Sequence, residues 1–344
     1  MRAVRLNAAG EPLRVVDLAM PAPSGSEVRV RVAGAGVCHT DLHIVDGTQA
    51  RVALPVTLGH EVAGWIDAVG PDAARPLRRM RLRLGDAVVV HGGWGCGECR
   101  DCLAGAEQRC ASSRAPGFQV DGGYAEAMLV PHPRHLVGLR RLDPVRAAPL
   151  ADAGVTPYRS IRRAERWLVP GARVLVIGCG ALGQFALQLL RLVPSAGGDL
   201  FVVVRELSPA HLERAAALGA DVGLLDGEPA LTLEALGRRA DVVLDFVGSE
   251  STLSHAAAVV APDGLLVLVG EAGGTIPFGF DAVPVESWLT TVAWGTRDDL
   301  REVVRFAGRG RLRWDVEAVP LTEAAAAHDR LRAGQVEGRI VLVP

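Results

Sequence analysis

A chain of 344 residues is long enough for two domains, and its 49% hydrophobic content is ample for two cores. Its formal net charge of -2 gives no electrostatic argument for nucleic-acid binding, and no apolar run approaches the roughly 18 residues that cross a membrane. All 37 basic residues are arginine, which excludes every mechanism that needs a lysine, such as Schiff-base or P-loop chemistry.

The first third of the chain is predicted to be rich in antiparallel strands, arranged as a small barrel. Apolar and polar side chains alternate most clearly over residues 27–32, and strand-like runs follow at 62–66 and 87–90. The arginine-rich segment 75–83 could be a phosphate-binding patch, but we interpret it as a solvated loop. The N-terminus has no secretory hydrophobic region, so we expect a cytoplasmic protein.

The segment from Cys38 to His43 combines a thiol with imidazoles, a hydroxyl and a carboxylate. A catalytic metal site uses about three protein ligands and leaves one position open for water or substrate. Thr40 and His43 can both pass protons. We therefore predict a zinc ion bound by this segment and by residues further along the chain, to which a nicotinamide is brought. Those further residues are His60, Glu61 and Asp152.

Four of the six cysteines are clustered at Cys96, Cys99, Cys102 and Cys110. In a reducing compartment this clustering favours a metal over disulfides. A tetrahedral shell of four thiolates leaves no vacancy, so we predict a structural zinc in a lobe over residues 95–111. An iron–sulfur cluster is the competing interpretation. The long final spacing and the lack of a proline after the last cysteine favour zinc.

From about residue 155 strands and helices alternate, which predicts a parallel, doubly wound sheet. The apolar strand 173–177 is followed by Gly178, Gly180 and Gly183, and then by a helical run over 184–191. This glycine pattern between a strand and a helix is typical of a dinucleotide-binding turn. The elements expected next are strand 200–204, helix 209–219, strand 242–246, helix 251–260 and strand 265–270.

Glu206 lies at the tip of the second strand, where an acidic side chain binds the adenosine ribose hydroxyls and repels a 2′-phosphate. Arg205 beside it could instead bind that phosphate. We favour NAD. After residue 290, helices are expected over 298–308 and 323–333, and a final strand over 338–343 returns to the first domain.

Taken together, these motifs identify a resemblance over essentially the whole chain to the zinc-dependent medium-chain alcohol dehydrogenases, of the bacterial type acting on secondary and aromatic alcohols. The matching segments are 36–41, 59–64, the four-cysteine lobe, 121–126, 153–158 and 178–183. The resemblance implies an α/β protein in which a GroES-like β-rich catalytic domain, residues 1–154 and 291–344, is joined to a Rossmann domain, residues 155–290.

The resemblance also implies roles for single residues. Cys38, His60 and Asp152 resemble the catalytic zinc ligands, with Glu61 as an adjacent carboxylate that can enter the shell. Asp152 stands where many members have cysteine. The charge balance survives, and because a subset of bacterial members that act on secondary and aromatic alcohols shares this aspartate, the zinc is retained. Cofactor contacts are expected at His39, Thr156, Gly178, Gly180, Ala181, Leu182, Gly183, Arg205, Glu206, Phe246, Val269, Gly270 and Arg339, of which His39 and Arg339 face the pyrophosphate. Trp94, Phe118 and Trp294 resemble pocket-lining residues, with core packing as the alternative.

The implied activity is reversible hydride transfer between an alcohol and NAD⁺, giving an aldehyde or ketone. Thr40 takes the alcohol proton and His43 carries it to solvent. The resemblance further implies two zinc ions per subunit, a homodimer or homotetramer, and neither nucleic-acid nor membrane partners. The alternatives are a polyol (sorbitol-type) dehydrogenase of the same superfamily and a non-catalytic redox sensor that binds NADH and zinc.

Overall fold

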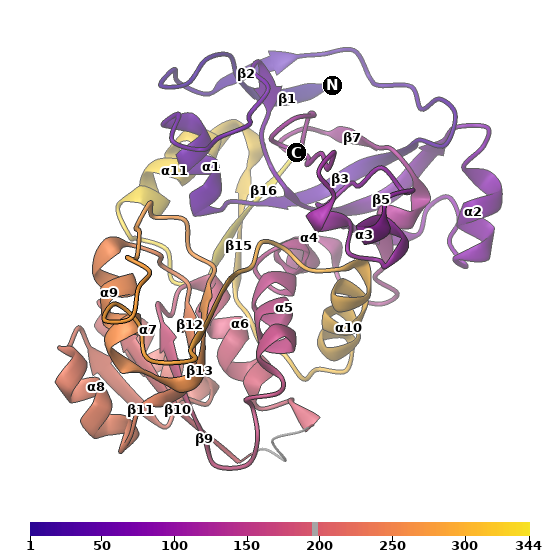
Figure 1. The fold of residues 1–344 in the computed structure, drawn as a ribbon. Coiled ribbons are helices and arrows are strands. Elements are labelled where there is room, and N and C mark those ends of the chain that lie inside the picture. Colours follow the sequence, from indigo (N-terminus) through magenta and orange to yellow (C-terminus); the bar gives the residue numbers. More distant parts are fainter. Residues whose placement is uncertain (195–198) are drawn as a thin grey trace. The chain divides into compact units, whose positions relative to one another are not determined.

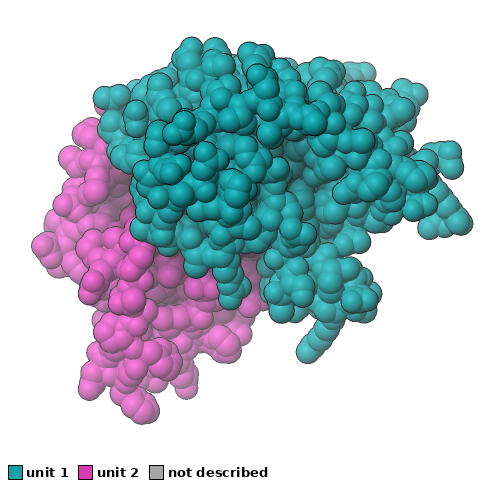
Figure 2. All heavy atoms as spheres, turned by 90° about the horizontal axis from the view of Figure 1, so that it is seen from above, with its two compact units in different colours: residues 1–155, 294–344 teal, residues 156–293 magenta. Residues whose placement is uncertain are grey.

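The computed structural model describes residues 1–194 and 199–344, and the chain forms two compact units (Figures 1 and 2). Unit 1 contains residues 1–155 and 294–344, and unit 2 contains residues 156–293. Among the helices in these described ranges, none has the length and apolar character needed to span a membrane.

Unit 1 is built on a seven-stranded sheet in the order β15-β16-β3-β5-β6-β8, with β7 also paired to β3. Its strands are β3 (Val28–Gly36), β5 (Glu61–Val69), β6 (Ala87–Val90), β7 (Ala127–Val130), β8 (Leu136–Gly138), β15 (Val316–Pro320) and β16 (Arg339–Val343). A smaller sheet joins β1 (Arg2–Leu6), β2 (Arg14–Asp17) and β4 (Val56–Thr57). Because β16 pairs antiparallel with β3, the C-terminal strand returns to the sheet formed by the N-terminal part.

The alternation that predicted β3 has a direct structural counterpart. Val28, Val30 and Val32 point into the core and are at most 4% exposed, while Arg31 on the opposite face stacks over the ring of Trp65. Burying one face of such a strand is what fixes its register, because a shift by one residue would expose every valine.

Short helices connect the strands of unit 1. They are α1 (His39–Val45), α2 (Ala74–Arg79), α3 (Arg100–Leu103), α4 (Pro144–Ala147), α10 (Arg297–Gly308) and α11 (Ala324–Arg332). The expected solvated loop over 75–83 is wrong for most of its length, since α2 covers residues 74–79. Leu77 is 3% exposed and anchors this helix to the core, whereas the arginines around it face solvent.

Unit 2 is a six-stranded parallel sheet in the order β11-β10-β9-β12-β13-β14. Its strands are β9 (Ala172–Ile177), β10 (Leu200–Glu206), β11 (Val222–Leu225), β12 (Ala240–Asp245), β13 (Val260–Leu268) and β14 (Trp288–Thr291). Its helices are α5 (Val155–Ala164), α6 (Ala181–Leu190), α7 (Pro209–Leu218), α8 (Pro229–Leu236) and α9 (Glu250–Val259). This is the doubly wound dinucleotide-binding order, so the predicted fold class is confirmed. Ligands of such sheets bind where the strand order reverses, which here is between β9 and β12.

Candidate active site

The structure brings the four predicted ligands of the catalytic metal together in unit 1. Each of them offers a donor atom within 4.8 Å of the others'. Cys38 lies directly before α1, His60 and Glu61 lie at the start of β5, and Asp152 follows the short 3-10 helix that ends at residue 151. The first three are at most 6% exposed, so most of the donor cluster is buried.

The electrostatics of this pocket favour a cation. The Asp152 Oδ2 atom lies 3.8 Å from the Cys38 sulfur and 3.7 Å from His60 Nε2. Burial acts to lower the pKa of His60, but the carboxylates of Asp41 and Asp152 outweigh it and raise that pKa well above its ordinary value. A thiolate, an imidazole and a carboxylate are the donor types of catalytic zinc. The residues present therefore fit zinc.

Glu61 is held by the C-terminal strand. The Arg339 guanidinium on β16 forms two hydrogen bonds to the Glu61 carboxylate, and the Nε–Oε2 bond is 3.0 Å long. The backbone N–H of Ala153 donates a third bond to Glu61, of 3.2 Å. Arg339, predicted to face a pyrophosphate, is thus a buried partner of the adjacent carboxylate in this structure.

Asp41 is a residue of the site to which the sequence reasoning assigned no role. Its Oδ2 atom accepts bonds from the backbone N–H of Cys38, at 2.9 Å, and from the Tyr124 hydroxyl, at 3.1 Å. Its Oδ1 atom lies 3.4 Å from His60 Nδ1. A fully buried carboxylate in the first turn of α1 therefore caps that helix and faces the imidazole of a predicted ligand. The sequence signal for this role was the position of Asp41 three residues after Cys38, a spacing that is typical of a capping box at the start of a helix.

Helix α1 also carries the predicted proton relay. Thr40 Oγ1 lies 3.7 Å from the Cys38 sulfur, so its hydroxyl is beside the donor cluster. His43 follows three residues later, and residues at this spacing share one face of a helix. His39 is exposed at the start of the same helix.

Two of the three predicted pocket aromatics lie against His60. The rings of Phe118 and Trp294 are 5.7 Å and 6.3 Å from the imidazole, and 5.7 Å from each other, all in edge-on arrangements. Trp94 belongs to the hydrophobic core of unit 1. Its indole donates a 2.7 Å bond to the carbonyl of His91 and packs near His135, as part of the hydrophobic core.

The four clustered cysteines form a second metal-binding arrangement, again with donor atoms within 4.8 Å of one another. Backbone N–H groups point at the sulfurs, as from Cys99 to Cys96 at 3.4 Å. Such bonds lower the pKa of Cys96 to about 7, whereas burial raises the pKa of Cys102 to about 12. A shared cation would stabilise the thiolate form of all four, which fits a closed zinc site.

The glycine turn of unit 2 leaves room for a ligand at the start of α6. Gly178 has a φ of +85°, and a Cβ at Gly183 would lie 2.2 Å from the Gly178 carbonyl oxygen. Around Gly180, which caps α6, a Cβ would meet nothing within 4 Å. The turn therefore needs glycine at Gly178 and Gly183 in order to fold. Gly180 leaves the N-terminus of the helix open to a pyrophosphate.

Glu206 supports this turn. Its carboxylate accepts hydrogen bonds from the backbone N–H groups of Cys179, Leu207 and Ser208, at 2.6, 2.6 and 3.1 Å. Burial acts to raise the pKa of Glu206, but His211 and these bonds lower it to about 2, so the group is ionised. The neighbouring Arg205 bonds instead to the Asp226 carboxylate, at 2.5 Å.

The other predicted cofactor residues of unit 2 are spread around the same region. Ala181 and Leu182 form the first turn of α6. Phe246 follows β12, and Val269 and Gly270 follow β13, so all three lie at the carboxyl edge of the parallel sheet. Thr156 is buried near the start of α5.

Comparisons with known proteins find relatives for both the metal-binding unit 1 and the dinucleotide-binding unit 2. Residues 24–141 match the family described as "Alcohol dehydrogenase GroES-like domain", and residues 218–342 match "Zinc-binding dehydrogenase". The chain is 37% identical to an NAD-dependent alcohol dehydrogenase of Sulfurisphaera tokodaii, over the full length of both. It is 36% identical to a D-arabinose 1-dehydrogenase (NADP(+)) of Saccharolobus solfataricus, covering 100% of this chain and 97% of the other. The solved alcohol dehydrogenase of Aeropyrum pernix superposes with a TM-score of 0.90 at 35% identity, over the full length of both.

The contact between Asp41 and His60 leads to a prediction about metal affinity. Asp41→Asn keeps an oxygen that can accept the Cys38 and Tyr124 bonds but removes the charge beside the imidazole. We expect zinc affinity, measured by competition with a chelator, to fall about 10- to 100-fold, as is typical when a group that orients a ligand is lost. Asp46→Asn is the matched control, because Asp46 ends the same helix and forms an exposed pair with Arg332. Equal affinities in the two variants would contradict the role of Asp41.

Proposed function

The chain belongs to the zinc-dependent medium-chain alcohol dehydrogenase family, and from this premise we propose that it oxidises primary or secondary alcohols, including aromatic ones, with NAD⁺. The reverse reaction reduces the aldehyde or ketone. The observation that carries the proposal is the gathering of Cys38, His60 and Asp152 donor atoms beside the Thr40 hydroxyl and two aromatic rings.

Cys38, His60 and Asp152 would hold the catalytic zinc, which when bound acts as a Lewis acid toward a substrate oxygen. Thiolate and carboxylate together balance the charge of a divalent ion. Both oxygens of Glu61 are bonded to Arg339, which supports a shell of three protein ligands with one position left for substrate.

The remaining residues of the site would bind the substrate and move its proton. Phe118 and Trp294 form an apolar wall beside His60, which suits an alkyl or aryl substituent and excludes water. The Thr40 hydroxyl would accept the substrate's hydroxyl proton, and His43, on the same face of α1, would pass it to solvent.

The dinucleotide would supply the hydride acceptor, and unit 2 would hold it. The pyrophosphate would bind at the N-terminus of α6 above the glycine turn, and Thr156 would lie beside the nicotinamide. The ribose fits Glu206. NAD is preferred over NADP in this proposal because Glu206 is ionised and the Arg205 guanidinium is already bonded to Asp226.

We also propose a structural zinc on the four-cysteine lobe, giving two zinc ions per chain. None of the six cysteines forms a disulfide in the described structure, which supports our expectation of a reducing compartment, the cytoplasm. Zinc analysis of the folded protein distinguishes this arrangement from an iron–sulfur cluster, which would add visible absorbance and iron.

A sugar or polyol is the second candidate substrate class. The identity to a D-arabinose dehydrogenase favours it, whereas the apolar wall of Phe118 and Trp294 favours an apolar alcohol. Following NADH formation with benzyl alcohol, 2-butanol, sorbitol and D-arabinose separates the two classes. A redox sensor would turn over none of them.

The ligand assignment predicts the behaviour of His60→Ala. We expect loss of alcohol turnover by at least about a thousandfold, because an essential ligand is missing, with zinc falling from two ions per chain to the one in the lobe. Binding of NADH, measured by its fluorescence, should be retained because unit 2 is unchanged. Full zinc content in an inactive, folded variant would show that His60 is not a ligand.

The cofactor assignment predicts the behaviour of Glu206→Gln. Glutamine keeps one oxygen, which can still accept the bonds from Leu207 and Ser208, but it loses the acceptor for Cys179 and the charge that repels a 2′-phosphate. We expect the ratio of kcat/KM for NAD⁺ to that for NADP⁺ to fall about tenfold or more. Arg205→Gln should leave this ratio within about twofold. An unchanged ratio in Glu206→Gln would contradict the assignment.

A homo-oligomer is further supported by the surface of unit 2. Phe278 and Phe280 are 83% and 96% exposed, and Trp288 on the edge strand β14 is half exposed. Large exposed apolar side chains and the edge strand of a sheet are features of interaction surfaces.

Replacing Phe280 with Ser should therefore lower the mass measured by light scattering after size exclusion, while Leu207→Ser, at another exposed apolar residue, should not. A monomeric wild-type protein would contradict the proposed assembly.

A further inference from the structure

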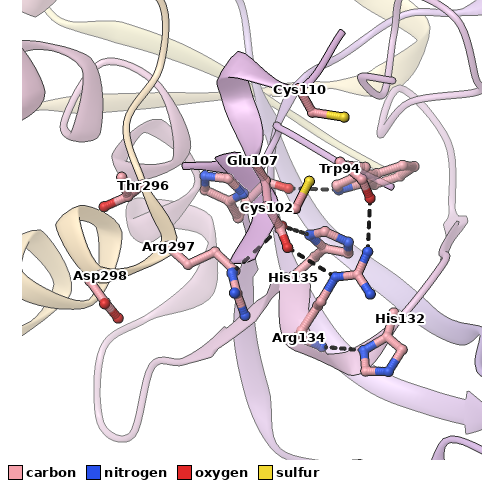
Figure 3. A network of polar contacts seen from close by, with 12 residues as sticks. Trp94, Cys102, Glu107, Cys110, His132, Arg134, His135, Thr296, Arg297 and Asp298 are labelled. Atoms are coloured by element: carbon pink, nitrogen blue, oxygen red, sulfur yellow. Dashed lines mark hydrogen bonds and ion pairs between the residues drawn. The ribbon is translucent and has the colours of Figure 1, made fainter. Parts of the chain in front are cut away.

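Unit 1 contains a second buried polar cluster, centred on Glu107 in the cysteine lobe (Figure 3). Glu107 begins a 3-10 helix between Cys102 and Cys110 and is 1% exposed. Its Oε1 atom lies 3.1 Å from the Arg134 Nε atom. Its Oε2 atom lies 3.2 Å from His135 Nδ1 and 3.5 Å from Arg297 Nε.

The charges in this cluster argue against a third metal ion. Donor atoms of His91, Glu107 and His135 lie within 4.8 Å of one another. However, the two guanidinium groups already outweigh the single carboxylate, and burial lowers the pKa of His135 to about 4, so its ring is neutral. A divalent cation would add charge to a site that is already positive. The cluster is an ion-pair network.

The short segment 294–296, which precedes α10, is held on both sides, by the Glu107 network at Arg297 and by His91 at Gly295. Arg297 is the first residue of that helix, and Thr296 caps it through reciprocal bonds with Asp299 of 2.8 and 3.0 Å. Upstream, the His91 ring forms a 2.8 Å hydrogen bond with the carbonyl of Gly295. Because a carbonyl only accepts, His91 donates from Nε2.

Trp294 occupies the end of this segment and reaches the candidate active site. Its φ of +50° is uncommon for a residue with a large side chain, so neighbouring contacts must hold it. Its indole packs on the backbone of Gly92, where a Cβ would lie 2.9 Å from the Trp294 Cε2 atom. The same ring lies in edge-on arrangements with the rings of Phe118 and His60.

We propose that Glu107 and Arg297 are positioning residues for Trp294, so that the cysteine lobe fixes one wall of the substrate pocket. The inference rests on the proposed function in that Trp294 is taken to contact substrate. The Glu107 carboxylate holds Arg297, and the His91 bond holds Gly295, so the backbone between them is restrained on both sides of residue 296. Without Arg297 the segment can relax from the left-handed conformation, and the indole leaves its place against His60.

The test compares Arg297→Ala with Arg301→Ala, its matched control. Arg301 lies one turn further along α10 and pairs only with Asp298 among the ion pairs of the described chain. In Arg297→Ala we expect KM for benzyl alcohol to rise about three- to tenfold. The kcat for benzyl alcohol and the KM for ethanol should both stay within about twofold of the wild-type values. Arg297→Lys, which keeps the charge, should restore KM to within about twofold of wild type. Arg301→Ala should match wild type.

Two further measurements separate positioning from general damage. Acrylamide quenching of the Trp294 fluorescence, obtained by subtracting the Trp294→Phe spectrum, should increase in Arg297→Ala and not in Arg301→Ala. In a Trp294→Ala background, Arg297→Ala should change KM for benzyl alcohol by less than about twofold, because the residue it positions is absent.

The proposal is overturned if quenching is the same in Arg297→Ala and Arg301→Ala, or if Arg297→Ala has an undiminished effect in the Trp294→Ala background. Quenching does not depend on turnover. An enzyme inactive on every alcohol with quenching as expected would therefore contradict the proposed function and leave the positioning intact.

Discussion

Matching of buried charge is the constraint on which the candidate active site depends. Asp41 and Glu61 are both fully buried, and an ionised carboxylate in such a place is stable only when hydrogen bonds and opposite charges surround it. For Glu61 the partner is Arg339, 278 residues away. The C-terminal strand β16 must therefore pair with β3 before the site beside β5 is complete, so unit 1 needs both ends of the chain.

The two metal arrangements of unit 1 differ in what their donors leave open. Four sulfurs in the lobe can close a tetrahedral shell, which suits a structural ion. At the catalytic cluster, Arg339 holds the fourth potential donor, Glu61, and three others remain. Because the Glu107 network runs from the lobe to the segment carrying Trp294, the four-cysteine lobe and the candidate catalytic cluster belong to a single framework.

The sequence predicted the features that depend on local pattern. Continuous apolar runs gave the strands of unit 2, and cysteine spacing gave the lobe. Helix α2 was missed because a single buried leucine gives no helical period. Asp41, Glu107 and the bond between Arg339 and Glu61 were missed because each depends on partners distant in sequence, so only the folded register brings them together.

The absence of lysine has a structural consequence at these buried carboxylates. A guanidinium group remains charged at any physiological pH and presents its donors in a fixed plane, whereas an ammonium group is a point charge that loses its proton more readily when buried. Arg339 can therefore bind both oxygens of Glu61 and fix the carboxylate's orientation as well as its charge. At Glu107, by contrast, Arg134 Nε and Arg297 Nε each approach a single carboxylate oxygen, so the charge matters there more than a fixed plane. Where a carboxylate beside a catalytic centre must be held by both of its oxygens, as Glu61 is, arginine supplies a direction that lysine does not.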